Sequence, residues 1–249
     1  MKKIVVLTGA GMSAESGIRT FRDSNGLWEE FDVMEVASIE GWYKNPGLML
    51  RFYNERRKQI LACEPNMGHL LLARLETNFE VHIITQNIDN LHERAGSTNV
   101  LHLHGELIKA RSSVDPLLIY TIGNKEIQLG EKCEKGSQLR PFIVWFGEEV
   151  PAMEAAIQTV ESADILCIIG TSLNVYPAAG LLHYAPYGSP VWLIDPNPPS
   201  GLSKSIHVIA KGAGEGVEEF IERVRTEKMR RNDGDGETDI CMEFGKINP

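Results

Sequence analysis

Residues 3–14 read KIVVLTGAGMSA, a short apolar run that ends in a glycine-rich turn. A strand that is apolar on both faces is typical of a parallel sheet covered by helices, so we expect a buried strand over Ile4 to Leu7. The turn has the form GxGxxA, whose glycines allow a tight bend and close approach of the backbone to a diphosphate. A plain glycine turn would read the same in isolation. The stretch therefore predicts a buried strand that opens a nucleotide-binding α/β sheet.

Five more short apolar runs follow the first along the chain. They are Val81 to Ile84, Val100 to Leu103, Ile165 to Ile169, Val191 to Ile194 and Ile206 to Ile209. Segments with apolar residues at helical spacing lie between them, namely Gly68 to Thr77, Ala152 to Ser162 and Val217 to Arg230. This alternation predicts the α/β class, as a Rossmann-like doubly wound parallel sheet.

Two stretches interrupt the alternation, residues 28–64 with helical character and residues 106–140 with no clear period. We expect these two insertions to build a second, smaller module. The Rossmann-like domain would then comprise residues 1–27, 65–105 and 141–227. Residues 228–249 end in a stretch rich in Asp, Glu and Gly, and we expect them to form a mobile tail.

Composition and net charge limit the classes of partner that the protein can bind and the cell compartment in which it is expected. The chain has 249 residues, 43% of them hydrophobic, and a formal charge of −9, which argues against nucleic acid or an anionic membrane as a partner. No apolar run approaches the ~20 residues needed to span a bilayer, and the amino terminus has no signal-peptide pattern. We therefore expect a cytoplasmic location. The four cysteines, Cys63, Cys133, Cys167 and Cys241, form no CxxC pair, so we expect neither a disulfide scaffold nor a cysteine zinc site.

Small and polar residues follow the predicted strands, where ligands bind in open parallel sheets. The segments are TQNIDN from residue 85, HGE from 104, GTS from 170, DPN from 195 and AKGAGEG from 210. One feature of ordinary dehydrogenases is missing, because the region about 20 residues after the glycine turn reads DSNGLWEEFD and contains no strand. A nucleotide would therefore lie differently here, which disfavours hydride transfer.

Five motifs in order, GAGMSAESGIRTFRDSNGLW, TQNIDNLHERAG, LHGEL, VWFGE and GTSLNVYPAA, together resemble the sirtuin (silent information regulator) family over residues 4–214. The resemblance implies an NAD-dependent protein lysine deacylase acting on an acylated-lysine protein or peptide. In that family the acyl-lysine oxygen displaces nicotinamide from NAD, a histidine acts as general base on the ribose hydroxyls, and O-acyl-ADP-ribose is released.

The resemblance implies catalytic roles for His104 and Asn87. A neutral imidazole suits a general base because its ordinary pKa of about 6.5 is close to working pH. The alternative for His104 is a structural hydrogen bond at a strand end, and for Asn87 and Asp89 a turn. The implied cofactor contacts are Gly9, Ala10, Gly11, Ser13, Ala14, Phe21, Arg22, Trp28, Gln86, Asn87, Ile88, Asp89, Gly170, Thr171, Ser172, Asp195, Asn197 and Ala213.

The implied substrate contacts fall in two segments. Val144, Phe146, Gly147 and Glu148 would pair with an extended peptide, although a core strand followed by a glycine turn is the alternative. Tyr53 and Arg56 lie three residues apart on a predicted helix and so share a face. This spacing resembles the bacterial type of the subgroup that accepts malonyl- or succinyl-lysine, in which the arginine pairs with the distal carboxylate. The alternative is an ordinary polar surface helix, and Arg57 is expected to face solvent.

The chain departs from the family in its small module, where most sirtuins carry four zinc-binding cysteines. Residues 109–141 retain only Cys133, so four thiolates cannot be assembled and we expect NAD but no zinc. The apolar run Leu117 to Ile122 is then expected to pack inward and hold the module. Two other functions stay open: protein ADP-ribosyl transfer or NAD hydrolysis on the same scaffold, and an NAD-binding sensor without catalysis.

Overall fold

The computed structural model describes residues 1–18, 31–171 and 176–234, with side chains described through residue 226. Its largest element is a six-stranded, wholly parallel sheet in the order β3-β2-β1-β7-β8-β9. The strands are β1 (Lys3–Thr8), β2 (Glu80–Thr85), β3 (Val100–His102), β7 (Ile165–Ile169), β8 (Val191–Ile194) and β9 (Ile206–Ile209). Each of the six apolar runs predicted as a strand is one, which confirms the doubly wound α/β fold.

The strand order places a topological switch point between β1 and β7. The chain moves outward from β1 to β2 and β3, then returns to the other side of β1 for β7, β8 and β9. Thr8 at the end of β1 pairs with Thr85 on one side and Ile169 on the other, so the three strands end level. The turns that follow them therefore meet at one edge, where open α/β sheets bind ligands.

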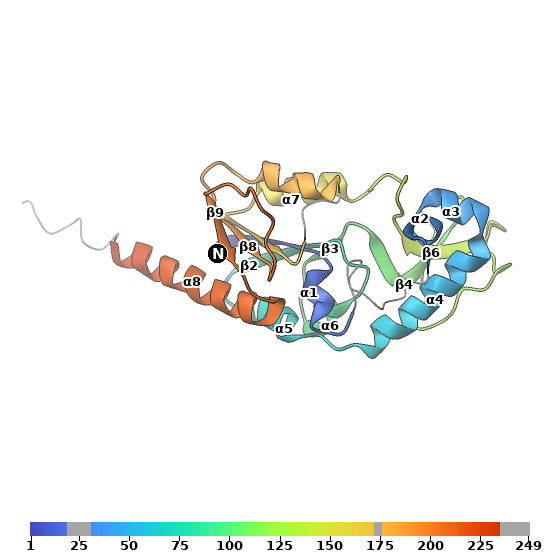
Figure 1. Ribbon diagram of the computed structural model, residues 1–249, viewed down its shortest axis with the longest axis horizontal. Coiled ribbons are helices and arrows are strands. Elements are labelled where there is room, and N and C mark those ends of the chain that lie inside the picture. The colour runs from blue at the N-terminus through green and yellow to red at the C-terminus, as the bar shows by residue number, and fades with distance from the viewer. Residues whose placement is uncertain (19–30, 172–175, 235–249) are drawn as a thin grey trace, which may run out of the picture.

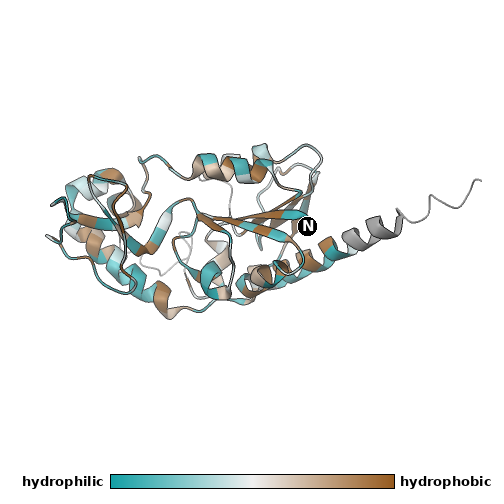
Figure 2. Cartoon of the chain, turned by 180° about the vertical axis from the view of Figure 1, so that it is seen from behind, coloured by the Kyte–Doolittle hydropathy of each residue, from teal (hydrophilic) through white to brown (hydrophobic). Residues whose placement is uncertain are grey.

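Helices cover both faces of this sheet (Figure 1). α5 (Met67–Leu75) and α8 (Ala213–Gly234) lie on one face, and α7 (Met153–Glu161) with the 3-10 helix η1 (Ala178–Tyr184) lies on the other. Alternate residues of each strand feed the two cores, which is why the strands are hydrophobic along most of their length (Figure 2). No helix within the described residues combines the length and apolar character needed to cross a membrane.

α8 continues beyond the expected domain end at residue 227. Its helical backbone runs through Gly234, so the first seven residues of the expected mobile tail are helical. Residues 235–249 of that tail lie outside the described residues. Two short helices, α1 (Gly11–Ala14) and α6 (Leu91–Ala95), follow β1 and β2 and sit close to the sheet edge that carries the turns.

A smaller module occupies the end of the molecule opposite the far end of α8 (Figure 1). It contains an antiparallel sheet in the order β5-β4-β6, formed by β4 (Gly105–Ser112), β5 (Ile119–Thr121) and β6 (Leu139–Ile143). It also contains the helices α2 (Val33–Val36), α3 (Ile39–Lys44) and α4 (Pro46–Ala62). Sequence periodicity missed β4, because a register shift between Gly105 and Ala110 breaks the alternation of buried and exposed residues along the strand.

The expected inward packing of the apolar run Leu117 to Ile122 is only half correct. Leu118, Tyr120 and Ile122 pack against the module core, whereas Leu117 is 87% exposed and Ile119 is 44% exposed. The exposed and half-buried residues alternate along β5, as expected for an antiparallel strand with one face on the core and the other toward solvent.

Arg57 was expected to face solvent, and this was wrong. The residue is 1% exposed, its Nε donates to the carbonyl oxygen of Leu107 at 2.7 Å, and its Nη1 donates to Asn54 Oδ1 at 2.7 Å. Asn54 in turn donates from Nδ2 to the carbonyl oxygen of Ile127 at 3.0 Å. Burial lowers the pKa of Arg57 to about 10, which leaves it charged at neutral pH. A buried arginine therefore ties α4 to β4 and to the loop around Ile127.

Replacing this arginine should destabilise the protein far more than replacing its neighbour. Arg57→Met leaves the carbonyl of Leu107 without its donor, and we expect the free energy of unfolding to fall by about 1–3 kcal/mol. Lys58→Met is the matched control, because the Lys58 side chain is 53% exposed. Its ion pairs with Glu55 and Glu126 are exposed to water and contribute little to stability. Urea titration of both variants measures the difference, and equal losses would contradict the structural role of Arg57.

Candidate active site

The glycine turns after β1 and β7 pack directly against each other. Gly9 N donates to the carbonyl oxygen of Ile169 at 3.0 Å, and Gly11 N donates to that of Gly170 at 2.9 Å. A Cβ on Gly11 would lie 2.6 Å from Gly170 Cα, and Gly170 itself has a φ of +61°. No larger residue fits between the two turns without moving backbone, so they form one joined floor at the switch point.

Five predicted cofactor residues from three separate segments meet above this floor. Asn87 Nδ2 donates to the carbonyl oxygen of Gly9 and to Ser13 Oγ, both at 3.0 Å, and Ser13 Oγ donates to Asp89 Oδ2 at 3.0 Å. Gln86 Nε2 donates to Thr171 Oγ1 at 3.2 Å. The segment after β2 is thus bonded to the turns after both β1 and β7.

Asp89 is the buried carboxyl group among these residues. It is 5% exposed, and its oxygens accept from Ser13 Oγ and from the backbone N of Leu91. Burial raises the pKa of Asp89, while these two hydrogen bonds and the charge of His102 oppose that rise. The neighbours therefore determine whether this carboxyl group is ionised.

His104 comes directly after β3, and the structure determines its tautomer. Its Nδ1 lies 3.0 Å from the carbonyl oxygen of Gln86, and a carbonyl only accepts hydrogen bonds. Nδ1 must therefore carry the proton, which leaves the lone pair on Nε2. Burial lowers the pKa of His104 below 6.5, although the bond to Gln86 opposes the shift. At neutral pH the side chain is consequently a neutral imidazole whose Nε2 can accept a proton.

Residues 144–148 run beside this histidine. Val144 N donates to the carbonyl oxygen of His104 at 3.0 Å, and Phe146, 47% exposed, exchanges backbone hydrogen bonds with Ala37 and Ile39. Gly147 has a φ of +87°. The carboxylate of Glu148 accepts from Arg140 Nη1 and Nη2 at 2.8 Å each, and from Trp145 N at 2.9 Å. Val144 is thus bonded to His104 and Phe146 to residues 37 and 39, whereas the Glu148 side chain is engaged internally.

Tyr53 and Arg56 are buried, so the alternative of an ordinary polar surface helix is wrong for both. They are 3% and 8% exposed. Trp145 Nε1 donates to the Tyr53 hydroxyl oxygen at 2.8 Å. Burial raises the pKa of Tyr53 and lowers that of Arg56, and the charge of Asp89 acts on Arg56 from across the site. The helix pair thus lies between residues 144–148 and the segment that holds Asp89.

The other predicted cofactor residues are less concentrated. Asp195 and Asn197 form a turn after β8, in which Asn197 N donates to Asp195 Oδ1 at 2.8 Å. Ala213, 4% exposed, begins α8, whose Gly214 N is bonded by the Glu15 carboxylate at 3.2 Å. Ala10 and Ile88 are half-buried, and Ala14 is exposed. Phe21, Arg22, Trp28 and Ser172 lie outside the described residues.

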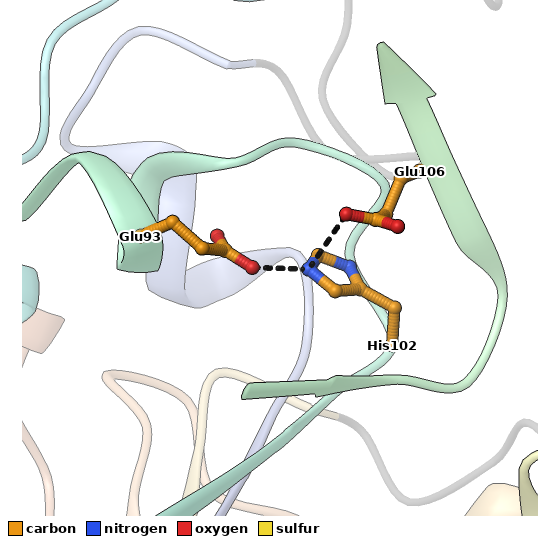
Figure 3. Close-up of side chains that lie close together, drawn as sticks. All are labelled: Glu93, His102 and Glu106. Carbon is orange, nitrogen blue, oxygen red and sulfur yellow. Dashed lines mark hydrogen bonds and ion pairs between the residues drawn. The ribbon is translucent and has the colours of Figure 1, made fainter. Parts of the chain in front are cut away.

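Sequence reasoning missed a cluster that includes His102, two residues before His104. Among the described residues, Glu93, His102 and Glu106 are the only group of three or more His, Cys, Asp or Glu side chains whose ligand atoms all lie within 4.8 Å of one another (Figure 3). His102 Nε2 is 2.7 Å from Glu93 Oε1, and Lys109 pairs with Glu106, so the charges balance without a metal ion and we assign none. The available signal was the spacing HLH, which places two imidazoles on the same side of an extended chain.

Comparison with known proteins finds consistent relatives. Residues 9–177 match the model of the Sir2 family. An NAD-dependent protein deacylase of Bacteroides thetaiotaomicron is 61% identical over 226 residues, 88% of this chain and 97% of the relative. An NAD-dependent protein deacylase of Helicobacter pylori is 50% identical over 225 residues, which are 90% of this chain and 98% of that relative. A solved Sir2 homologue in complex with NAD is 38% identical with a TM-score of 0.82, covering 91% of this chain and 90% of the other.

The tautomer and charge of His104 can be measured directly. We expect its neutral form to carry the proton on Nδ1 and its pKa to lie below 6.5, because burial disfavours the imidazolium. Nitrogen-15 NMR of the histidine side chains reports both, with the urea-unfolded chain as the control in which the pKa returns to about 6.5. A side chain protonated on Nε2, or a pKa above 6.5, would contradict this assignment.

Proposed function

The chain belongs to the Sir2 family, and from this premise we propose that it is an NAD-dependent protein lysine deacylase releasing nicotinamide and O-acyl-ADP-ribose. The observation that carries the proposal is one constellation at the switch point of the sheet. A neutral His104 with its Nε2 lone pair adjoins a segment, Gln86 to Asp89, that is hydrogen-bonded to both glycine turns.

NAD, when bound, supplies a ribose carbon from which nicotinamide can leave. Residues of the chain would bind the cofactor, orient it and accept the proton. The glycine turns would let the backbone approach the diphosphate, and Asn87 and Asp89, held by their bonds to Gly9 and Ser13, would orient the nicotinamide ribose. His104 Nε2 would accept a proton from a ribose hydroxyl, so that this oxygen could attack the acyl carbon.

The proposed cofactor contacts follow this geometry. Within the described residues they are Gly9, Ala10, Gly11, Ser13, Ala14, Gln86, Asn87, Ile88, Asp89, Gly170, Thr171, Asp195, Asn197 and Ala213. Phe21, Arg22, Trp28 and Ser172 stay predictions from the motifs. A substrate peptide would lie along Val144 to Gly147, which places its acyl-lysine next to His104. Glu148 contributes by holding Trp145 in place.

We further propose that the acyl group is acidic and short, as in malonyl- or succinyl-lysine. Arg56 offers a planar charged donor in a buried setting, and a carboxylate is the group that such a fork binds best. Trp145 Nε1 is a donor, so the Tyr53 oxygen accepts from it, and within the described part of the chain the Tyr53 hydroxyl donates to no other side chain or backbone group. Two donors on one helix face thus converge on the same side of the site.

Three expected absences also remain proposals. With only Cys133 in residues 106–140, we propose that the small module holds its shape without zinc, through its apolar core and the buried Arg57. The charge of −9 supports the proposals that neither nucleic acid nor an anionic membrane is a partner. The cytoplasmic location stays a prediction from the sequence.

A peptide assay tests the function. We expect the protein, incubated with NAD and an acetyl- or succinyl-lysine peptide, to release nicotinamide from NAD and deacylated peptide in a one-to-one ratio. With the unmodified lysine peptide, neither product should form. His104→Ala should retain NAD binding by calorimetry and lose turnover by at least about a hundredfold, because the base is gone. Nicotinamide release without deacylation would instead indicate ADP-ribosyl transfer or NAD hydrolysis. NAD binding with no reaction would indicate a sensor.

A variant of the buried arginine tests the acyl preference. Arg56→Met should lower kcat/KM for the succinyl peptide about a hundredfold and that for the acetyl peptide less than about fivefold, because only succinate needs a charged partner. Arg51→Met is the matched control, because Arg51 lies on the same helix but is exposed, and it should change neither rate. Equal losses on both peptides would refute a carboxylate contact at Arg56.

A further inference from the structure

We propose that His102 is a second histidine of the same reaction, a positively charged positioning residue that fixes the carbonyl of Asn87 and thereby the Gln86–Asp89 segment. This inference rests on the proposed function, because positioning has meaning only for a segment that grips NAD. His102 itself has no proposed contact with either substrate.

The hydrogen bonds of His102 require two donors. Its Nδ1 lies 3.1 Å from the carbonyl oxygen of Asn87, and its Nε2 lies 2.7 Å from Glu93 Oε1 (Figure 3). A carbonyl and an ionised carboxylate only accept, whereas a neutral imidazole has a single N–H. Both contacts are satisfied together when the ring is an imidazolium.

The surroundings favour that charge. Burial by itself would lower the pKa of His102, but the hydrogen bond and charge of Glu93 and the charge of Glu106 outweigh it, so the pKa is raised. Facing the ring are Glu93 and His92 from α6, Glu106 and Lys109 from β4, and Asp89 from the segment after β2. His92, also buried, has its pKa lowered and is neutral. Lys109 forms an ion pair with Glu106, and Glu93 forms one with His102.

His102 and His104 perform the same geometric task, one as a charged imidazolium and the other as a neutral imidazole. Each Nδ1 holds one of two successive carbonyls, Asn87 for His102 and Gln86 for His104. His104 stays neutral because burial dominates its pKa, whereas His102 is charged because Glu93 meets its other nitrogen. One imidazole is free to take a proton and the other serves as a fixed ionic clamp.

The clamp acts on the residues that orient the cofactor. Fixing the Asn87 carbonyl fixes the backbone from which the Asn87 amide reaches Gly9 and Ser13. The charge of His102 also opposes the rise that burial causes in the pKa of Asp89, and so favours the ionised carboxylate. Loss of the His102 proton should therefore loosen the segment and weaken NAD binding as pH rises.

The test pairs two substitutions with a matched control. His102→Gln removes the charge and one donor. Glu93→Gln keeps His102 but lets the new amide donate to a neutral Nε2, which removes the charge alone. The control is the His82 and Glu80 pair on β2, where Nε2 and Oε1 are 2.8 Å apart in a partly exposed setting, replaced as His82→Gln and Glu80→Gln. Calorimetry measures the Kd of NAD across pH, and thermal unfolding confirms that each variant folds.

We expect His102→Gln to raise the Kd of NAD about tenfold at neutral pH, as loss of a partner that orients a ligand-binding group does elsewhere. In the wild type the Kd should rise on the alkaline side, and in Glu93→Gln that rise should move to lower pH. The control variants should match the wild type. A Kd for both site variants equal to that of the wild type would overturn the proposal.

Two further outcomes separate this proposal from others. Nitrogen-15 NMR at pH 7 should show both His102 nitrogens protonated, and a neutral ring there would overturn the clamp whatever the activity. EDTA should leave binding and turnover unchanged, and a loss that matches His102→Gln would assign the cluster to a metal instead. If the wild type binds NAD without deacylating any peptide, the proposed function fails, while the NMR and Kd results still decide the role of His102.

Discussion

The close approach of the turns after β1 and β7 is the constraint on which the site depends. Gly11 and Gly170 leave no space for a side chain between them, so the two turns form a single surface at the switch point of the sheet. The segment after β2 is then bonded to this surface through Asn87 and Gln86. Because all three strands end level, small shifts in their register would separate these groups. The site is consequently a property of the sheet rather than of a single loop.

Polar side chains near this surface differ in charge because their second contacts differ. His104 and His102 are two residues apart and each bonds one backbone carbonyl, yet burial keeps the first neutral and Glu93 keeps the second charged. Arg56 and Asp89 show the same principle. Burial lowers the pKa of Arg56 and the charge of Asp89 opposes it, whereas burial raises the pKa of Asp89 and its bonds to Leu91 and Ser13 and the charge of His102 oppose it. The protonation state of each of these groups depends on its contacts and burial more than on its residue type.

The fold was predictable because the six strands appear in the sequence as short, nearly continuous apolar runs, and β1, β2, β7 and β8 are buried along most of their length. The convergence of Gly9, Asn87 and His104 was predictable from the rule that ligand sites lie at strand ends. β4 was not, because its register shift breaks the period, and neither were the burial of Arg57 and the charge of His102. Both depend on contacts between residues far apart in sequence, such as Arg57 with Leu107 and His102 with Glu93. Residue patterns within a single sequence do not reveal which distant residues are in contact.

The small module illustrates how buried arginines can join a helix, strands and loops. Arg57 joins α4 to β4, and Arg140, 2% exposed, both bonds Glu148 and stacks 3.5 Å from the Trp145 ring centroid. Trp145 then donates to Tyr53 on α4. A guanidinium reaches several acceptors at fixed angles, so each arginine orders more than one strand or loop at once. Because this chain of contacts ends at Tyr53, the rigidity of the module and the shape of the proposed acyl pocket have the same physical origin.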